Sequence, residues 1–180
     1  MTGGGADASD LRAMLLASGA VRFGEFTLAS GQKSDVYVDI KKAWTDPARL
    51  RLIGRALAAR VGHVDRLAGM ELGAVPLVVA TALETGLPYA VIRKAAKAHG
   101  TQQRYEGELP PGAEVLVIED VTTTGGSVVD TIEVVRGAGA LVTRVLCVVD
   151  RNAGATERLA AMHVRLEALT TLAALRGAPA

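Results

Sequence analysis

Hydrophobic and polar positions along the 180-residue chain follow two periods, one near 3.6 residues and one of two residues. Apolar side chains at the longer period predict helices over residues 7–18, 46–62, 76–85 and 127–137. Alternating or continuous short apolar runs predict strands over 23–28, 36–40, 66–68, 89–92, 114–118 and 141–149. The last segment, 157–175, is expected to add an edge strand around 164–166 and a short helix.

The order of these segments predicts an α/β fold with a central, mainly parallel sheet flanked by helices. Strands and helices alternate from residue 46 onwards, and the continuous apolar runs 115–118 and 145–149 are typical of strands buried on both faces. Residues 1–45 precede this alternation and are expected to form a small N-terminal hood lobe. A chain of this length is expected to be a single domain, 1–180.

Composition and charge exclude several classes of protein. Hydrophobic residues make up 49% of the chain and charged residues 22%, as in ordinary globular proteins. Apolar stretches such as 74–83 are too short to span a bilayer, and 1–10 lacks the pattern of a secretory signal, so we expect a cytoplasmic protein without membrane contact. A net charge of +1 argues against nucleic-acid binding. The single cysteine, Cys147, excludes an intrachain disulfide and is expected to be a buried apolar residue.

The segment 115–127 carries the strongest chemical signal. An apolar strand ends in Glu119 and Asp120, and a Thr-rich stretch then leads through Gly125-Gly126 to Ser127, which opens the next helix. Glycines allow close backbone approach to an anion, and the helix N-terminus and the hydroxyl groups add hydrogen-bond donors, so this turn predicts a phosphate site. The acid pair is then suited to accept hydrogen bonds from the hydroxyls of a sugar attached to that phosphate. The alternative is a capping turn with exposed acids.

A basic segment follows the predicted strand 89–92. Arg93, Lys94, Lys97 and His99 lie within seven positions, in a stretch 93–112 that has hardly any aliphatic residues. Such a long stretch predicts a mobile loop that closes over a ligand and stabilises negative charge, although many charge runs are simply solvated.

The segment 115–127 resembles the phosphoribosyl diphosphate signature of the type I phosphoribosyltransferases. The stretches Phe23–Gly31 and Arg93–Gly100 are similar to motifs of the orotate-specific branch, and the similarity runs over about residues 10–170. The resemblance implies transfer of ribose 5-phosphate from 5-phosphoribosyl 1-diphosphate to orotate, giving orotidine 5′-phosphate and diphosphate in UMP synthesis. It also implies Mg²⁺ carried by the diphosphate without a dedicated protein metal site, and a homodimer that shares the 93–112 loop across its interface.

The resemblance also assigns roles to individual residues. Lys97 is the best candidate for catalysis, together with Arg93, Lys94 and His99, and Thr123 and Arg151 are expected to bind orotate. The residues expected to bind the phosphoribosyl diphosphate are Arg93, Lys94, Lys97, His99, Glu119, Asp120, Val121, Thr122, Thr123, Thr124, Gly125, Gly126 and Ser127.

The chain departs from the family pattern at two positions. Many members carry lysines where this chain has Ala29 and Gly73, and Lys33, Lys41 or Lys42 are candidates to replace those cations. Two other functions stay open: a transferase for another base, such as a purine, and a ligand sensor that regulates transcription. Arg151 argues against the first, because a guanidinium suits the carboxylate of orotate.

Overall fold

The computed structural model describes residues 8–27, 31, 33–95 and 103–177. Its strands are β1 (Val21–Thr27), β2 (Lys33–Val38), β3 (Arg66–Met70), β4 (Tyr89–Ile92), β5 (Tyr105–Glu106), β6 (Val115–Thr122), β7 (Arg144–Asp150) and β8 (Arg165–Thr171). Its helices are α1 (Ala8–Ala17), α2 (Lys41–Trp44), α3 (Pro47–Ala58), α4 (Val75–Thr85), α5 (Gly126–Gly137), α6 (Ala155–Ala160) and α7 (Leu172–Leu175).

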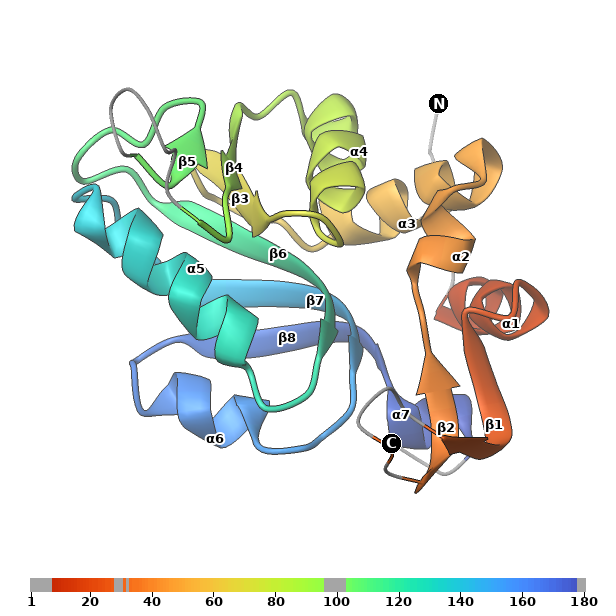
Figure 1. Cartoon of the computed structure of the whole chain (residues 1–180). Coiled ribbons are helices and arrows are strands. Elements are labelled where there is room, and N and C mark those ends of the chain that lie inside the picture. Colours follow the sequence, from red (N-terminus) through yellow and green to blue (C-terminus); the bar gives the residue numbers. More distant parts are fainter. Residues whose placement is uncertain (1–7, 28–30, 32, 96–102, 178–180) are drawn as a thin grey trace.

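The strands form two sheets. Six of them make one sheet in the order β5-β4-β3-β6-β7-β8, in which all neighbours are parallel except β4 and β5. The remaining pair, β1 and β2, is antiparallel and lies apart from the large sheet beside α1 and α7 (Figure 1). The predicted α/β architecture with a small N-terminal lobe, here called the hood (residues 8–45 as described), is confirmed.

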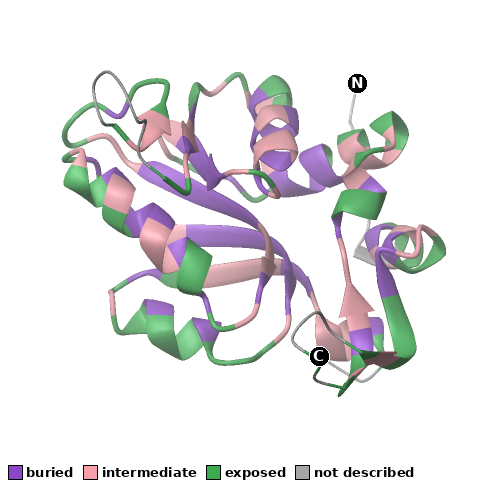
Figure 2. Cartoon of the chain, viewed as in Figure 1, coloured by how far each residue is buried: buried purple, intermediate pink, exposed green. Residues whose placement is uncertain are grey.

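Two apolar clusters cover the two faces of the large sheet. One joins the sheet to α3, α4 and the hood, and the other joins it to α5 and α6. Along β6, Leu116 and Ile118 belong to the first cluster and Val115 and Val117 to the second, because successive side chains of a strand point to opposite faces. The strand is therefore buried on both sides (Figure 2), as its continuous apolar run predicts.

The ends of the helices follow from local sequence. Asp46 caps α3 by accepting a hydrogen bond from the Arg49 N–H at 3.0 Å, and Pro47 occupies the first helical turn. Gly86 ends α4 in the left-handed conformation, with a φ of 75°. These two signals predicted both boundaries correctly.

The expectation that the whole segment 93–112 is loop was wrong for its second half. Tyr105 and Glu106 form β5, which pairs with Ile92 and Val91 of β4. Leu109 is 5% exposed and packs in the cluster beneath α5, so this part has an apolar anchor. Two residues of strand are too few to produce a visible period in the sequence.

Several other boundaries also differ from expectation. Strand β6 continues through the acid pair to Thr122, and β7 begins at Arg144, three residues later than predicted. Leu141 forms only an isolated bridge with Glu114 and is 54% exposed. The short helices α2 and α6 were not expected, since four to six residues carry little periodic signal.

The chain after β8 fastens the hood to the large sheet. Arg176, which follows α7, pairs with Asp35 of β2 at 2.5 Å, and its guanidinium lies 5.0 Å from the centre of the Phe23 ring. Arg12 of α1 also donates a hydrogen bond to the Ala174 carbonyl. Across the described ranges, every helix is too short or too polar to traverse a lipid bilayer.

Candidate active site

The acid pair lies at the carboxyl end of β6, in the middle of the sheet. Because β6 is still extended there, Glu119 and Asp120 point to opposite sides of the strand. Glu119 is buried beside α5 and accepts hydrogen bonds from the Asp120 N–H and the Ser127 hydroxyl, both at 3.0 Å. Asp120 is half-buried on the side of Gly73 and accepts a hydrogen bond from the Val121 N–H at 2.8 Å. The two carboxyl groups thus have different surroundings.

The difference appears in their ionisation. Burial raises the pKa of Glu119 to about 8, and the negative charge of Asp120 adds to the rise. Near neutral pH these surroundings therefore favour a protonated Glu119. A ligand that brings hydroxyl groups or positive charge to this position would favour the ionised form.

The turn after β6 has the geometry expected for an anion site. Gly125 precedes α5 in the left-handed conformation, with a φ of 76°, and a side chain there would approach Ala155 at 3.4 Å. The first amides of α5, from Gly126 onwards, have no carbonyl partner within the helix and carry its positive end. A backbone site for a phosphate is therefore available directly beside the acid pair.

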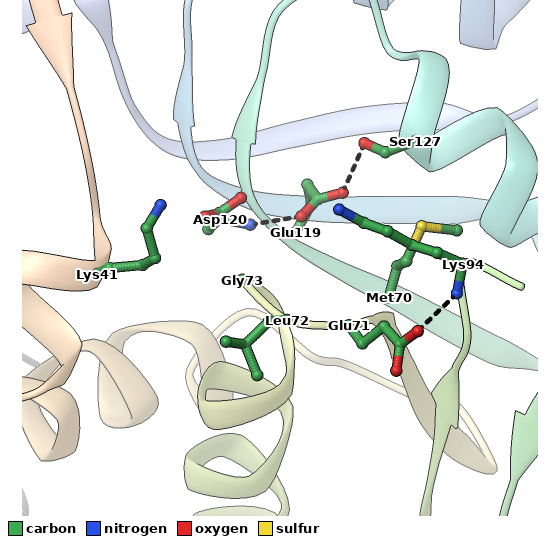
Figure 3. A pocket seen from close by; sticks show the side chains of 9 residues that line it. All are labelled: Lys41, Met70, Glu71, Leu72, Gly73, Lys94, Glu119, Asp120 and Ser127. Atoms are coloured by element: carbon green, nitrogen blue, oxygen red, sulfur yellow. Dashed lines mark hydrogen bonds between the residues drawn. The ribbon is translucent and has the colours of Figure 1, made fainter.

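A cavity of about 370 Å³ opens beside the acid pair (Figure 3). Its lining comes from the hood, from the turn after β3, from the end of β4 and from the β6–α5 junction, and consists of Lys41, Met70, Glu71, Leu72, Gly73, Lys94, Glu119, Asp120 and Ser127. The close-up shows Lys41 and Lys94 on opposite sides of the cavity, with the two acids between them. The structure thus brings four of the predicted site residues together: Lys94, Glu119, Asp120 and Ser127.

The turn between β3 and α4 forms the wall of the cavity next to Asp120. A Cβ at Gly73 would lie 2.5 Å from the Asp120 Oδ2, so glycine lets the backbone come this close without displacing the carboxylate. Glu71 accepts a hydrogen bond from the Lys94 N–H at 2.9 Å, and the Glu71–Leu72 peptide bond is cis. This wall offers the ligand mainly backbone groups.

The base of the basic loop is clamped to α5. Arg104 makes two hydrogen bonds of 2.7 Å to the Asp130 carboxylate, and it also donates to the carbonyls of Arg93 and Lys94 at 3.1 and 2.9 Å. The ion pair keeps the pKa of Asp130 below its usual range. Arg93 is directed to Glu106 of β5 at 3.2 Å and does not line the cavity. Lys97 and His99 lie outside the described residues.

The remaining predicted residues lie around the cavity rather than in its lining. Thr122 is 1% exposed, and its hydroxyl donates to the Asp150 Oδ1 at 2.9 Å, so its side chain supports the turn from within. Thr123 and Arg151 are half-buried at the same edge of the sheet, and the Arg151 N–H donates to the Thr122 carbonyl at 3.0 Å. Val121 is half-buried against the hood-side cluster.

Of two further residues near the site, the sequence did not single out Arg158 and named Lys41 only as one of three candidate cations. Arg158 of α6 donates to the Thr124 carbonyl at 3.4 Å and lies 3.9 Å from the position of a Cβ on Gly126. Lys41 was only one of three weak candidates, and the cavity now distinguishes it from Lys42, whose ammonium lies 5.6 Å from the centre of the Tyr37 ring. Neither position belongs to a local motif, because the fold brings them to the site from distant segments.

Cys147 and the acidic residues were considered as a possible nucleophile and as possible metal ligands. Burial raises the pKa of the Cys147 thiol to about 12, which makes it a poor nucleophile. In the described part of the chain, His, Cys, Asp and Glu side chains form no group of three or more that suits a metal ion. Glu119 and Asp120 nevertheless supply the carboxylate oxygens that suit Mg²⁺ bound largely by water and substrate.

A twisted parallel sheet with an acid pair, a glycine turn and a helix N-terminus at its carboxyl edge is the construction of a ribose-phosphate site. The profile of the phosphoribosyl transferase domain matches residues 42–166, which include all the elements of this edge. The fold and the site thus define a phosphoribosyltransferase.

Comparison with individual proteins narrows the class. The chain is 52% identical to the orotate phosphoribosyltransferase of Methanosarcina mazei over 164 residues, which is 90% of this chain and 88% of the relative. The crystal structure of the orotate phosphoribosyltransferase from Aeropyrum pernix superimposes with a TM-score of 0.81 at 36% identity, covering 93% of this chain and 96% of that one. The Mycobacterium tuberculosis H37Rv enzyme, solved in complex with 5-phospho-α-D-ribosyl 1-diphosphate, gives a TM-score of 0.78 at 30% identity, covering 94% and 98%. This chain belongs to the orotate phosphoribosyltransferase family.

Proposed function

We propose that the chain transfers ribose 5-phosphate from 5-phosphoribosyl 1-diphosphate to orotate, giving orotidine 5′-phosphate and diphosphate in the synthesis of UMP. The observation that carries the proposal is the acid pair Glu119–Asp120 directly before the glycine turn, in a cavity that also contains lysines. Carboxylates, backbone amides and cations match the hydroxyls, the 5′-phosphate and the diphosphate of this donor. The complex of the Mycobacterium tuberculosis relative with the same donor supports the assignment.

In this proposal the turn 121–127 binds the 5′-phosphate. The amides of Gly126 and Ser127 and the hydroxyls of Thr123 and Thr124 donate to the phosphate, and the α5 dipole adds to the attraction. Glu119 and Asp120 accept hydrogen bonds from the ribose hydroxyls. These contacts fix the sugar so that its C1 atom faces the base.

The bond from C1 to the diphosphate breaks, and its electron pair leaves with the diphosphate. A ring nitrogen of orotate bonds to C1, and the proton of that nitrogen passes to the leaving diphosphate or to water. Positive charge develops on the sugar and negative charge on the leaving diphosphate. The positive charge on the sugar is stabilised by Glu119 and Asp120. The negative charge on the diphosphate is stabilised by the basic residues Arg93, Lys94, Lys97 and His99, so catalysis is electrostatic. Mg²⁺ carried by the diphosphate would neutralise part of that charge, and Glu119 and Asp120 would be the carboxylates beside it.

Orotate specificity is assigned to Arg151 and Thr123. A guanidinium can donate two parallel hydrogen bonds to the orotate carboxylate, which uracil and purines lack. Arg151 is half-buried at the end of β7 and lies close enough to the hood for its charge to lower the pKa of Asp35, after the larger influence of Arg176. The base is therefore placed between the sheet edge and the hood.

The segment 93–112 is assigned to closure over the substrate, in a cytoplasmic homodimer whose loops cover the partner's site. The clamp between Arg104 and Asp130 gives this loop a fixed base. Leu83 of α4 is 82% exposed and Tyr89 39% exposed, which supplies apolar surface for an interface. Light scattering of the purified protein gives its mass and tests the dimer. If each loop completes the partner's site, a mixture of the two inactive variants Lys97→Ala and Glu119→Ala should regain activity.

The reaction itself is tested by the loss of orotate absorbance when 5-phosphoribosyl 1-diphosphate and Mg²⁺ are added. Uracil and hypoxanthine serve as control bases, and omission of the donor serves as the blank. The proposal expects turnover with orotate alone. Preference for hypoxanthine would replace it with a purine transferase.

A further inference from the structure

The hood contributes a cation to the substrate cavity. Lys41 is the first residue of α2, directly after the hood hairpin, and its side chain lines the cavity together with Gly73, Glu119 and Asp120. In Figure 3 its ammonium group points towards Asp120 from the side opposite Lys94. Two lysines from separate parts of the fold therefore flank the same space.

The position of Lys41 is set by Asp39. The Lys41 Nζ lies 2.8 Å from the Asp39 Oδ1, and the Asp39 N–H donates to the Ala20 carbonyl at 2.7 Å, which ties the carboxylate's backbone to the hood. The hydrogen bond that Lys41 donates to the Asp39 carboxylate raises the pKa of Lys41, so the ammonium stays charged. Its side chain is still 56% exposed, which leaves the charge accessible to a ligand.

The turn after β3 supplies no such charge in this chain, because its residue beside Asp120 is Gly73. A Cβ at Gly73 would lie 2.5 Å from the Asp120 Oδ2, so with Asp120 in its present position the turn approaches the cavity with its backbone. Of the described residues that line the cavity, Glu71, Glu119 and Asp120 are acidic and only Lys41 and Lys94 are basic. Both cations favour a multiply charged anion beside these acids, because unpaired like charges in a partly desolvated site are unfavourable.

We propose that Lys41 binds the diphosphate group of the sugar donor, on the side opposite Lys94, and that this contact links the hood to the occupied site. The inference rests on the proposed function, since it requires a diphosphate in this cavity. Arg151 and Thr123 do not line the cavity, so Lys41 acts on the donor and not on the base. Lys41 is then a substrate-binding residue supplied by the hood.

The test compares Lys41→Gln, Lys41→Arg and the matched control Lys42→Gln. Lys42 is the next residue of α2, is exposed and does not line the cavity. For Lys41→Gln we expect the KM for the donor and the calorimetric Kd for inorganic diphosphate with Mg²⁺ each to rise about tenfold, the loss of one charge-assisted contact. The KM for orotate should change less than about twofold, Lys41→Arg should recover most of the loss, and Lys42→Gln should match the wild type.

Several results would overturn the proposal. An unchanged Kd for diphosphate in Lys41→Gln excludes the contact, and an equal rise in the KM of orotate and donor assigns Lys41 to hood placement instead. If Lys41→Gln lowers the melting temperature, Asp39→Asn provides a second variant that keeps the lysine, and it should weaken diphosphate binding by a smaller factor without affecting orotate. A wild-type protein that binds diphosphate but consumes no orotate would refute the proposed reaction and leave the Lys41 contact standing.

Discussion

The central strand β6 and the hood both contribute residues to the substrate cavity, but the two regions differ in how deeply their residues are buried. Residues 115–119 of β6 are buried on both faces, whereas β1 is exposed along most of its length. The hood packs one apolar side, which includes Leu15 and Val36, into the cluster that it shares with the sheet, and it adds polar contacts at its rim, including Asp35–Arg176 and Asp39–Lys41. The comparison indicates that the sheet fixes the sugar and phosphate, while the hood is the part able to adjust around the rest of the ligand.

The largest expected effect on activity concerns the basic loop, which belongs to neither the central sheet nor the hood. Lys97→Ala should lower kcat about a thousandfold, or about 4 kcal/mol in activation free energy, because the lysine is assigned to charge that develops only in the transition state. The free energy of unfolding should stay within about 0.5 kcal/mol of the wild type. Steady-state rates and urea unfolding measure the two quantities, and unchanged turnover would remove Lys97 from catalysis.

Two Leu→Ala substitutions, one in the sheet and one in the hood, test the difference in packing. Leu146→Ala in β7 should lower the free energy of unfolding by about 3 kcal/mol, because Leu146 is 1% exposed between the sheet and its helices. Leu16→Ala in α1, where the side chain is 40% exposed, should lower it by less than about 1 kcal/mol. Urea unfolding of both variants checks the difference, and equal losses would show that the surface of α1 around Leu16 is as tightly packed as the sheet around Leu146.

The buried acid should make the protein less stable as pH rises. The unfolded chain releases the Glu119 proton near its ordinary pKa of 4.5, whereas the folded protein keeps it until about pH 8. The folded state therefore binds more protons between these values, and the free energy of unfolding contributed by this group falls from pH 4.5 to pH 8 and levels off above.

Glu119→Gln removes this titration. The unfolding free energy of the variant, relative to that of the wild type, should rise by about 4 kcal/mol between about pH 5 and about pH 9. Urea unfolding at a series of pH values measures this change. The kcat/KM of the variant should be low and lose the rise towards about pH 8 that the wild type is expected to show as Glu119 ionises. Parallel stability profiles for variant and wild type would contradict the assignment.

The smallest expected effect concerns the ion pair that fastens the hood. Arg176→Ala removes the partner of Asp35 and the contact with the Phe23 ring. Both partners are well exposed, so the melting temperature should fall by only about 2 °C or less. Calorimetry checks the shift, and a much larger fall would mean that the hood depends on this pair rather than on its buried residues.

Much of the fold could be predicted from local sequence, and the reasons are visible in particular residues. Asp46-Pro47 and Gly86 fixed two helix ends, and the apolar run 115–118 identified the central strand. The motif 119–127 predicted the acid pair and the turn because both are contiguous in the chain. The family resemblance then supplied the reaction, and the comparisons agree with it.

What could not be predicted depends on contacts between distant segments. Lys41 and Asp120 are 79 positions apart, and only the placement of the hood brings them to one cavity. The clamp between Arg104 and Asp130, and the burial of Leu109, likewise need the packing of β5 beside α5. The raised pKa of Glu119 follows from its burial at the end of β6. The sequence alone could not predict this burial, because it is also compatible with a capping turn whose acids are exposed.

The most direct test is a crystal structure of the protein with ribose 5-phosphate bound. We predict a phosphate on the amides of residues 124–127 and ribose hydroxyls on the carboxylates of Glu119 and Asp120. A turn that stays empty at saturating ligand, or a sugar bound elsewhere on the protein, would contradict the account.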